Sequence, residues 1–226
     1  MNRIVVIIPA RNEAGRVGEV VRAAKAAQSP SAVWVVDNAS ADSTAEEALQ
    51  AGAQVMYCPT VGKGNAVAYA MEQLVEADDV VVLLDGDLLG LTAEHIDALI
   101  APITSGDYVQ ACAVLANGLF HRMLWRWHVG LTGTRAFRAG LLWEVCPIDY
   151  MGWSLEAALN SIARWSPLRP KRQIAKMYFA GVTGTDKRQK LATLSESKKA
   201  KRQVFSQVVR AYIRFVLPIR YKILLT

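Results

Sequence analysis

The segment VVVLLDGDLLG, residues 80–90, runs from five apolar residues directly into two aspartates that flank one glycine. An uninterrupted run of Val and Leu is typical of a strand that is buried on both faces, as in a parallel sheet covered by helices. Two similar runs occur earlier, RIVVIIP at residues 3–9 and AVWVVD at residues 32–37. Because stretches of helical composition separate these runs, the sequence predicts an α/β fold with a mainly parallel sheet flanked by helices.

The remaining elements are predicted from caps, turns and shorter apolar runs. Asp42 and Ser43 indicate the start of a helix that stops at Gly52, and Thr92 with Glu94 indicates the start of another. We expect further strands near residues 53–57, 108–115 and 174–179, helices near residues 119–127 and 154–164, a turn region at residues 131–140, and a long basic helix at the end of the chain.

Composition restricts the class of protein. The 226 residues, 52% of them hydrophobic, suffice for one large domain with a substantial core. Cys58, Cys112 and Cys146 are odd in number and have no CxxC spacing, so we expect neither a disulfide framework nor a zinc site, and a reducing cytoplasm fits best. No segment approaches about 18 uninterrupted apolar residues, so no membrane-spanning helix is expected. The N-terminal apolar run is too short for a signal peptide.

Charge is distributed unevenly along the chain. From residue 186 onward there are eleven Lys and Arg and two acids, a net charge of +9, so the first 185 residues contribute −3 to the total of +6. A basic tail on a mildly acidic body indicates an anionic partner at that end. Apolar residues at helical spacing in the tail fit an amphipathic helix on an anionic membrane, and equally a helix packed on the body or on a second subunit of a homodimer. Nucleic acid is disfavoured because no known binding motif accompanies the charge.

The Asp85-Gly86-Asp87 triplet is the most informative chemical feature. In an extended segment residues i and i+2 face the same side, so both carboxylates point together, and Gly86 lacks the side chain that would keep a ligand off the backbone. Adjacent carboxylates repel unless a cation lies beside them, and their hard oxygens suit Mg²⁺ or Mn²⁺ bridging to a substrate's phosphates. The alternative is an Asp-Gly turn that closes a strand without any ligand.

Polar residues also follow the other predicted strands. Ligands of open α/β sheets bind beyond the carboxyl ends of the strands. There the chain places PARNE at residues 9–13, DNASADST at residues 37–44 and GKGNA at residues 62–66. Polar ends that converge on one edge of the sheet predict a ligand site.

Each of these segments also has an ordinary structural explanation. Asn12 and Glu13 are suited to cap a helix, and Asp37, Ser40 and Asp42 are common in turns and caps. The Gly62-Lys63-Gly64 element is either a plain helix start or a loop that binds phosphate. Only the order of the segments along the chain distinguishes these readings.

The order VVIIPARNE, VWVVDNASADST, VGKGNAVAYAM, VVLLDGDL resembles that of family 2 nucleotide-sugar glycosyltransferases with the GT-A fold, over about the first hundred residues. The resemblance implies a GT-A, Rossmann-like domain at residues 1–185, with a nucleotide-sugar-binding half at 1–115 and an acceptor-side half at 116–185. The basic helical tail at 186–226 would follow it. A dinucleotide-dependent oxidoreductase is disfavoured because the first turn reads PARNEAG rather than GxGxxG.

The same resemblance implies roles for individual residues. Asp85 and Asp87 would form the DXD motif that binds the metal, with Asp87 as the direct ligand. The residues implied at the nucleotide sugar are Pro9, Ala10, Asn12, Glu13, Asp37, Ser40, Gly62, Lys63, Gly64, Asp85 and Gly86.

The second half resembles the dolichol-phosphate mannosyltransferase and undecaprenyl-linked branch of that family. GLTGTRAFRAGLL, residues 130–142, is similar to its acceptor-side segment and implies that Gly133, Thr134 and Arg135 lie near the acceptor. GWSLEAALN, residues 152–160, is similar to the segment in which the branch carries an acid facing the acceptor, here Glu156. The branch's Glu-Asp pair is absent because Ala157 follows.

These resemblances imply metal-dependent transfer of a sugar from a UDP- or GDP-linked donor to a lipid phosphate or a small hydroxyl compound, with Mg²⁺ or Mn²⁺ as cofactor. A metal ion at Asp87, with a cationic side chain such as Lys63 or one of Lys187, Arg188 and Lys190, would stabilise the leaving diphosphate. Glu156 is the candidate base for a hydroxyl acceptor, whereas a lipid phosphate needs none. The alternative is a non-catalytic domain of the same fold that binds a membrane or a partner. We expect a cytoplasmic protein, peripheral at the inner face of the membrane if the tail binds lipid.

Overall fold

The computed structural model describes residues 2–115, 132–140, 155–156, 159–160, 163 and 172–184. The predicted helix at residues 119–127 and the basic tail at 186–226 lie outside these ranges. The helices are α1 (Val17–Ala26), α2 (Thr44–Gln50), α3 (Lys63–Leu74) and α4 (Ala93–Thr104). The strands are β1 (Ile4–Ala10), β2 (Ala32–Asp37), β3 (Gln54–Tyr57), β4 (Val80–Leu83), β5 (Leu88–Leu89), β6 (Tyr108–Leu115), β7 (Arg135–Arg138), β8 (Arg172–Phe179) and β9 (Thr183–Gly184). Helical residues at 155–156, 159–160 and 163 fit the helix predicted near 154–164.

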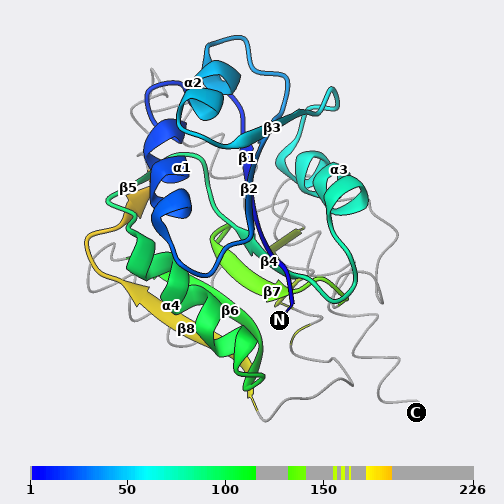
Figure 1. Ribbon diagram of the computed structural model, residues 1–226, viewed down its shortest axis with the longest axis vertical. Coiled ribbons are helices and arrows are strands. Elements are labelled where there is room, and N and C mark those ends of the chain that lie inside the picture. The colour runs from blue at the N-terminus through cyan, green and yellow to red at the C-terminus, as the bar shows by residue number, and fades with distance from the viewer. Residues whose placement is uncertain are drawn as a thin grey trace, which may run out of the picture.

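In the described part of the chain, seven strands form one sheet in the order β3-β2-β1-β4-β7-β6-β8, and β5 and β9 form a separate two-stranded ribbon. The pairs β1–β2, β1–β4, β2–β3 and β6–β8 are parallel, and β7 is antiparallel to both β4 and β6. α1 and α4 lie on one side of the sheet and α3 lies on the other (Figure 1). The predicted α/β fold with a mainly parallel sheet flanked by helices is confirmed.

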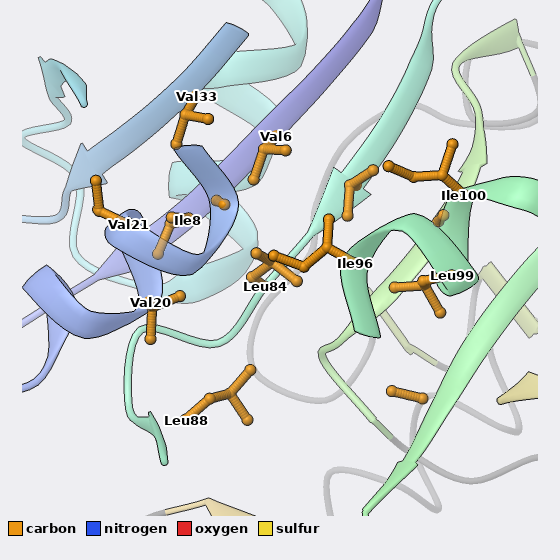
Figure 2. Close-up of a cluster of buried hydrophobic side chains, with 14 of the residues drawn as sticks. Val6, Ile8, Val20, Val21, Val33, Leu84, Leu88, Ile96, Leu99 and Ile100 are labelled. Carbon is orange, nitrogen blue, oxygen red and sulfur yellow. The ribbon is translucent and has the colours of Figure 1, made fainter. Parts of the chain in front are cut away.

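The sheet has a hydrophobic core on each face, which explains the uninterrupted apolar runs. Successive strand residues point to opposite faces, so Val6 and Ile8 of β1 join the core beneath α1 and α4, while Val5 and Ile7 join the core beneath α3. Figure 2 shows the first of these cores, where side chains of α1 and α4 meet those of the strands. Since both faces of the sheet are buried, polar side chains of the central strands can reach solvent or a ligand only at the strand ends.

A short strand occupies the region for which the sequence predicted a turn. β7 pairs with β4 and β6, so the prediction of a turn region at residues 131–140 is wrong at its centre. Arg-Ala-Phe-Arg offers only two apolar residues as a strand signal, and the buried position of Arg135 is not what a charged residue suggests. Because Leu83 pairs with Arg135, β7 brings residues 132–134 beside the segment that follows β4.

Within the ranges described, no helix has the length and hydropathy needed to cross a bilayer. The half-domain division at residue 115 and the domain end at residue 185 both fall where the described segments stop, so the proposed domain boundaries stay predictions.

Candidate functional site

The predicted polar segments gather at one edge of the sheet. Ala10 at the end of β1 pairs with Asp37 at the end of β2, and Asp37 pairs in turn with Tyr57 at the end of β3. Ile7 pairs with Leu83 at the end of β4, only two residues before Asp85. Parallel strands therefore deliver all four segments to their shared carboxyl edge, where α/β sheets bind ligands.

The loops after β1 and β2 are tied together by their own side chains. The Asn12 amide N–H donates to Ser40 Oγ at 3.1 Å, and the Ala41 N–H returns a bond to Asn12 Oδ1 at 2.9 Å. Asn12 has a φ of 55°, a conformation that Asn adopts more readily than most residues. Glu13 donates its N–H to Thr44 Oγ1 at 2.8 Å, at the start of α2. The PARNE and DNAS segments thus form one rigid wall, in which Asn12 and Ser40 shape the backbone.

Asn38 belongs to the site and was missed from the sequence. It is buried at 3% exposure, and its Oδ1 accepts the Gly62 N–H at 2.6 Å while its Nδ2 donates to the Thr60 carbonyl at 2.7 Å. The Asn38 side chain therefore satisfies two backbone groups of the loop that leads into α3. Asp37 beside it is also buried, and its Oδ1 accepts the Ser40 N–H at 3.2 Å. An Asn directly after a predicted strand could have indicated this role, because side-chain amides there commonly form hydrogen bonds with backbone groups of the adjoining loop.

Lys63 is the first residue of α3 and forms the centre of the site. Its Nζ lies 2.6 Å from Asp85 Oδ1 and 3.1 Å from Glu156 Oε1. Burial acts to lower the pKa of Lys63, but the two carboxylates outweigh it and hold that pKa well above its ordinary value. The ammonium is therefore charged, and it joins a residue of the predicted donor side to one of the predicted acceptor side.

Glu156 is almost fully buried, with 2% of its surface exposed. One carboxylate oxygen is paired with Lys63, while Oε2 is buried and has no hydrogen-bond partner in the described part of the chain. A buried ionised oxygen without a donor is costly unless a ligand or water supplies one. Glu156 therefore presents an oxygen that can receive a proton or a hydrogen bond.

Gly133 and Thr134 lie in contact with the ion pair of Lys63 and Asp85. Thr134 Oγ1 donates to Asp85 Oδ2 at 3.3 Å. A Cβ added to Gly133 would lie only 2.1 Å from Lys63 Nζ and 2.2 Å from Asp85 Oδ1, so only glycine permits this approach. Gly133 and Thr134, which the resemblance placed near the acceptor, thus lie beside Asp85.

Arg135 lies beneath the site in a buried polar network. Its guanidinium donates to the Thr132 carbonyl and, at 3.1 Å, to Asn160 Oδ1, which also accepts Gln110 Nε2 at 3.1 Å. Arg135 is completely buried. With these partners the side chain fixes residues 132–134 against the helical segment that carries Glu156 and Asn160.

The DGD triplet does not have the extended geometry expected from sequence. β4 ends at Leu83 and Gly86 and Asp87 lie in a turn before β5, so the two-residue strand periodicity does not apply to the carboxylates. Gly86 is buried, and a Cβ there would lie 3.3 Å from the Ala10 Cβ, which makes it a packing contact with the PARNE segment. Asp85 and Asp87 are both half-buried at the carboxyl edge. Pro9 and Gly64, also predicted here, occupy the end of β1 and the first turn of α3.

A comparison with protein families identifies the family of this chain. The model described as glycosyl transferase family 2 matches residues 5–157, which include every segment of the site. Among curated proteins, Protein RfbJ of Shigella flexneri is 40% identical over 84 residues, 37% of this chain and 64% of the relative. Glycosyltransferase AglJ of Haloferax volcanii is 36% identical over 109 residues, 47% of this chain and 34% of the relative. The chain thus spans less than two thirds of the length of either relative.

Solved structures share the fold across nearly the whole chain. Glucosyl-3-phosphoglycerate synthase from Mycobacterium tuberculosis, in complex with Mn²⁺, UDP-glucose and phosphoglyceric acid, superposes with a TM-score of 0.73 at 20% identity, covering 93% of this chain and 79% of that one. The same enzyme with phosphoglyceric acid alone gives a TM-score of 0.73 and covers 80% of that chain. At this identity the likeness establishes the GT-A type of fold and nothing finer.

Proposed function

Because this chain belongs to glycosyl transferase family 2, we propose that it transfers a sugar from a nucleotide-diphosphate sugar to an acceptor hydroxyl with the help of a divalent cation. The observation that carries the proposal is the joining of Asp85 and Glu156 through Lys63 at the carboxyl edge of the sheet. The ammonium of Lys63 contacts both the carboxylate of Asp85, on the predicted donor side, and the carboxylate of Glu156, on the predicted acceptor side.

The DGD turn suits a cation that is shared with a substrate. In the described residues no three His, Cys, Asp or Glu side chains gather as a complete protein cage. Mg²⁺ is commonly held by one or two carboxylates together with substrate phosphates. By the resemblance to the DXD motif we assign direct coordination to Asp87. Asp85, whose two oxygens accept hydrogen bonds from Lys63 and Thr134, takes a supporting position. Bound there, Mg²⁺ or Mn²⁺ would offset the charge that develops on the leaving diphosphate. The solved relatives that hold Mn²⁺ or Mg²⁺ with UDP support this assignment.

The nucleotide sugar is proposed to lie along the wall made by the first two loops. Asp37 and the backbone of residues 9–13 border this position, and Asn38 fixes the loop at residues 60–62 that closes it. Since these groups are held by hydrogen bonds within the protein, the wall is formed before the donor arrives, which lowers the entropy cost of binding. The donor base and sugar are left open between UDP- and GDP-linked compounds.

The acceptor is proposed to be a hydroxyl compound rather than a lipid phosphate. Among the described residues nothing donates a hydrogen bond to the buried Oε2 of Glu156. A hydroxyl acceptor would supply such a donor, while an ionised phosphate would bring another negative charge beside this carboxylate. As the hydroxyl attacks the anomeric carbon, its proton passes to Oε2, which makes Glu156 the general base. The bond between the anomeric carbon and the diphosphate breaks in the same displacement, and the electron pair leaves with the diphosphate.

The test is nucleotide-dependent stabilisation. We expect Mn²⁺ together with UDP or GDP to raise the melting temperature, because a ligand that binds only the native state stabilises it. Asp87→Ala should abolish the shift, whereas the matched control Asp78→Asn, an exposed carboxylate at the opposite end of β4, should keep it. The absence of a shift with every nucleotide in the wild type would contradict the proposal.

A further inference from the structure

We propose that Lys63 is a positioning residue that fixes the carboxylates of Asp85 and Glu156 relative to each other, and that it does not bind the donor diphosphate. This inference rests on the proposed function and differs from the sequence-based expectation, which placed Lys63 at the nucleotide or diphosphate. A lysine between two glycines at a helix start suggests a phosphate loop, so the distinction matters for the mechanism.

The partners of the ammonium argue against a phosphate ligand. Nζ carries three N–H donors, and two of them serve the oxygens of Asp85 and Glu156 at 2.6 and 3.1 Å. The backbone of Gly133 lies close to Nζ on a further side, because a Cβ added to Gly133 would fall only 2.1 Å from that nitrogen. At most one N–H donor of Nζ is left for another ligand, and a diphosphate bound there would lie next to both carboxylates.

The charge of the cluster gives the same answer. One ammonium and two carboxylates sum to −1, so the cluster has no surplus positive charge with which to hold a diphosphate, whereas it suits a divalent cation. Donor binding at this edge would therefore depend on the metal at the DGD turn, and the lysine would serve to keep the two acids apart by a fixed distance.

A fixed distance has a kinetic consequence. A displacement of the base by about 1 Å can reduce the rate of a displacement reaction on the order of 100-fold while binding is unaffected. Loss of Lys63 should thus lower kcat and leave donor affinity in place. A diphosphate ligand would show the opposite pattern, since its loss weakens binding of the nucleotide.

The decisive experiment compares Lys63→Met with the wild type in two measurements, kcat for transfer and the Kd of UDP or GDP in the presence of Mn²⁺ by calorimetry. We expect kcat to fall about 100-fold and the Kd to change less than about threefold. A Kd that rises tenfold or more in a folded Lys63→Met protein would overturn the inference and leave the proposed function intact. A wild type that neither binds a nucleotide nor transfers a sugar would overturn both.

A second variant keeps all three charges and tests the spacing alone. Gly133→Ala inserts a methyl group where Nζ and Asp85 Oδ1 now lie, and Gly184→Ala is its matched control because nothing lies within 4 Å of the added Cβ. We expect Gly133→Ala to lower kcat at least tenfold with an unchanged nucleotide Kd, and Gly184→Ala to behave as the wild type. Should a folded Gly133→Ala protein keep its kcat, the spacing of the pair would not matter and the inference would be wrong, whether or not Lys63→Met can be purified.

Discussion

Removing the Lys63 ammonium should destabilise the fold itself, because it leaves the buried Glu156 and the half-buried Asp85 without the cation between them. At an effective dielectric constant of about 20, unit charges 3 Å apart attract by roughly 5 kcal/mol, and much of this is offset by the desolvation of the ammonium. Measured losses on breaking a buried ion pair are about 3–5 kcal/mol. The side chains of Lys63 and Asp85 are 31% and 28% exposed. Water therefore screens part of the interaction, and we expect Lys63→Met to lower the free energy of unfolding by about 2–3 kcal/mol.

Denaturant unfolding at neutral pH measures this loss directly, as a shift of the midpoint at constant slope. Lys25→Met, an exposed lysine in the last turn of α1, is the matched control and should stay within about 0.5 kcal/mol of the wild type. Adding Glu156→Gln to Lys63→Met removes one of the two carboxylates left without a cation. The double variant should regain at least about 1 kcal/mol of the free energy of unfolding. The reasoning is refuted if Lys63→Met matches the control, or if the double variant recovers nothing.

Three further predictions concern residues around the site and the core. Asn38→Ala leaves the Gly62 N–H and the Thr60 carbonyl without their partner, so thermal unfolding should show a loss of about 1–3 kcal/mol and nucleotide affinity should fall; equal affinity would contradict the loop-anchoring role. Burial acts to raise the pKa of Asp79, but the hydrogen bonds from Arg3 and from the Glu76 N–H, together with the charge of Arg3, outweigh it, and the pKa lies below its ordinary value. The ionised Asp79 therefore contributes its full stabilisation above about pH 4 and loses it on further acidification. In Asp79→Asn, the free energy of unfolding measured against pH should lack this loss, and a pH profile identical to the wild type would contradict the assignment. Leu99→Ala empties a completely buried position of α4 and should cost about 2–5 kcal/mol in denaturant unfolding, and a loss below 1 kcal/mol would show that the core is not packed as described.

The fold was predictable because its signal is repeated. Each of β1, β2 and β4 is an apolar run with both faces buried, and a polar segment follows each at the edge where the parallel order requires it. β7 was hidden for the opposite reason, since a four-residue strand bounded by arginines has no periodicity to detect. Its stability comes from the strands on either side, which is information that no local window contains.

The candidate site was predictable in its membership but not in its connections. Lys63, Asp85, Gly133 and Glu156 were each singled out, yet the sequence places them up to 93 positions apart and says nothing of the ion pairs. Asn38 was overlooked because its neighbours Asp37 and Ser40 carry the more familiar signals. Side chains that satisfy loop backbone, as Asn38 does, are recognisable only once the loop they hold is seen.

The most direct test of the whole account is a screen of UDP- and GDP-linked sugars for metal-dependent release of the nucleoside diphosphate in the presence of hydroxyl acceptors. We predict release with one donor class in Mn²⁺ or Mg²⁺, its loss in EDTA and in Asp87→Ala, and a strong reduction in Glu156→Gln at unchanged nucleotide affinity. Release that persists in EDTA, or that is the same in both variants as in the wild type, would contradict the account.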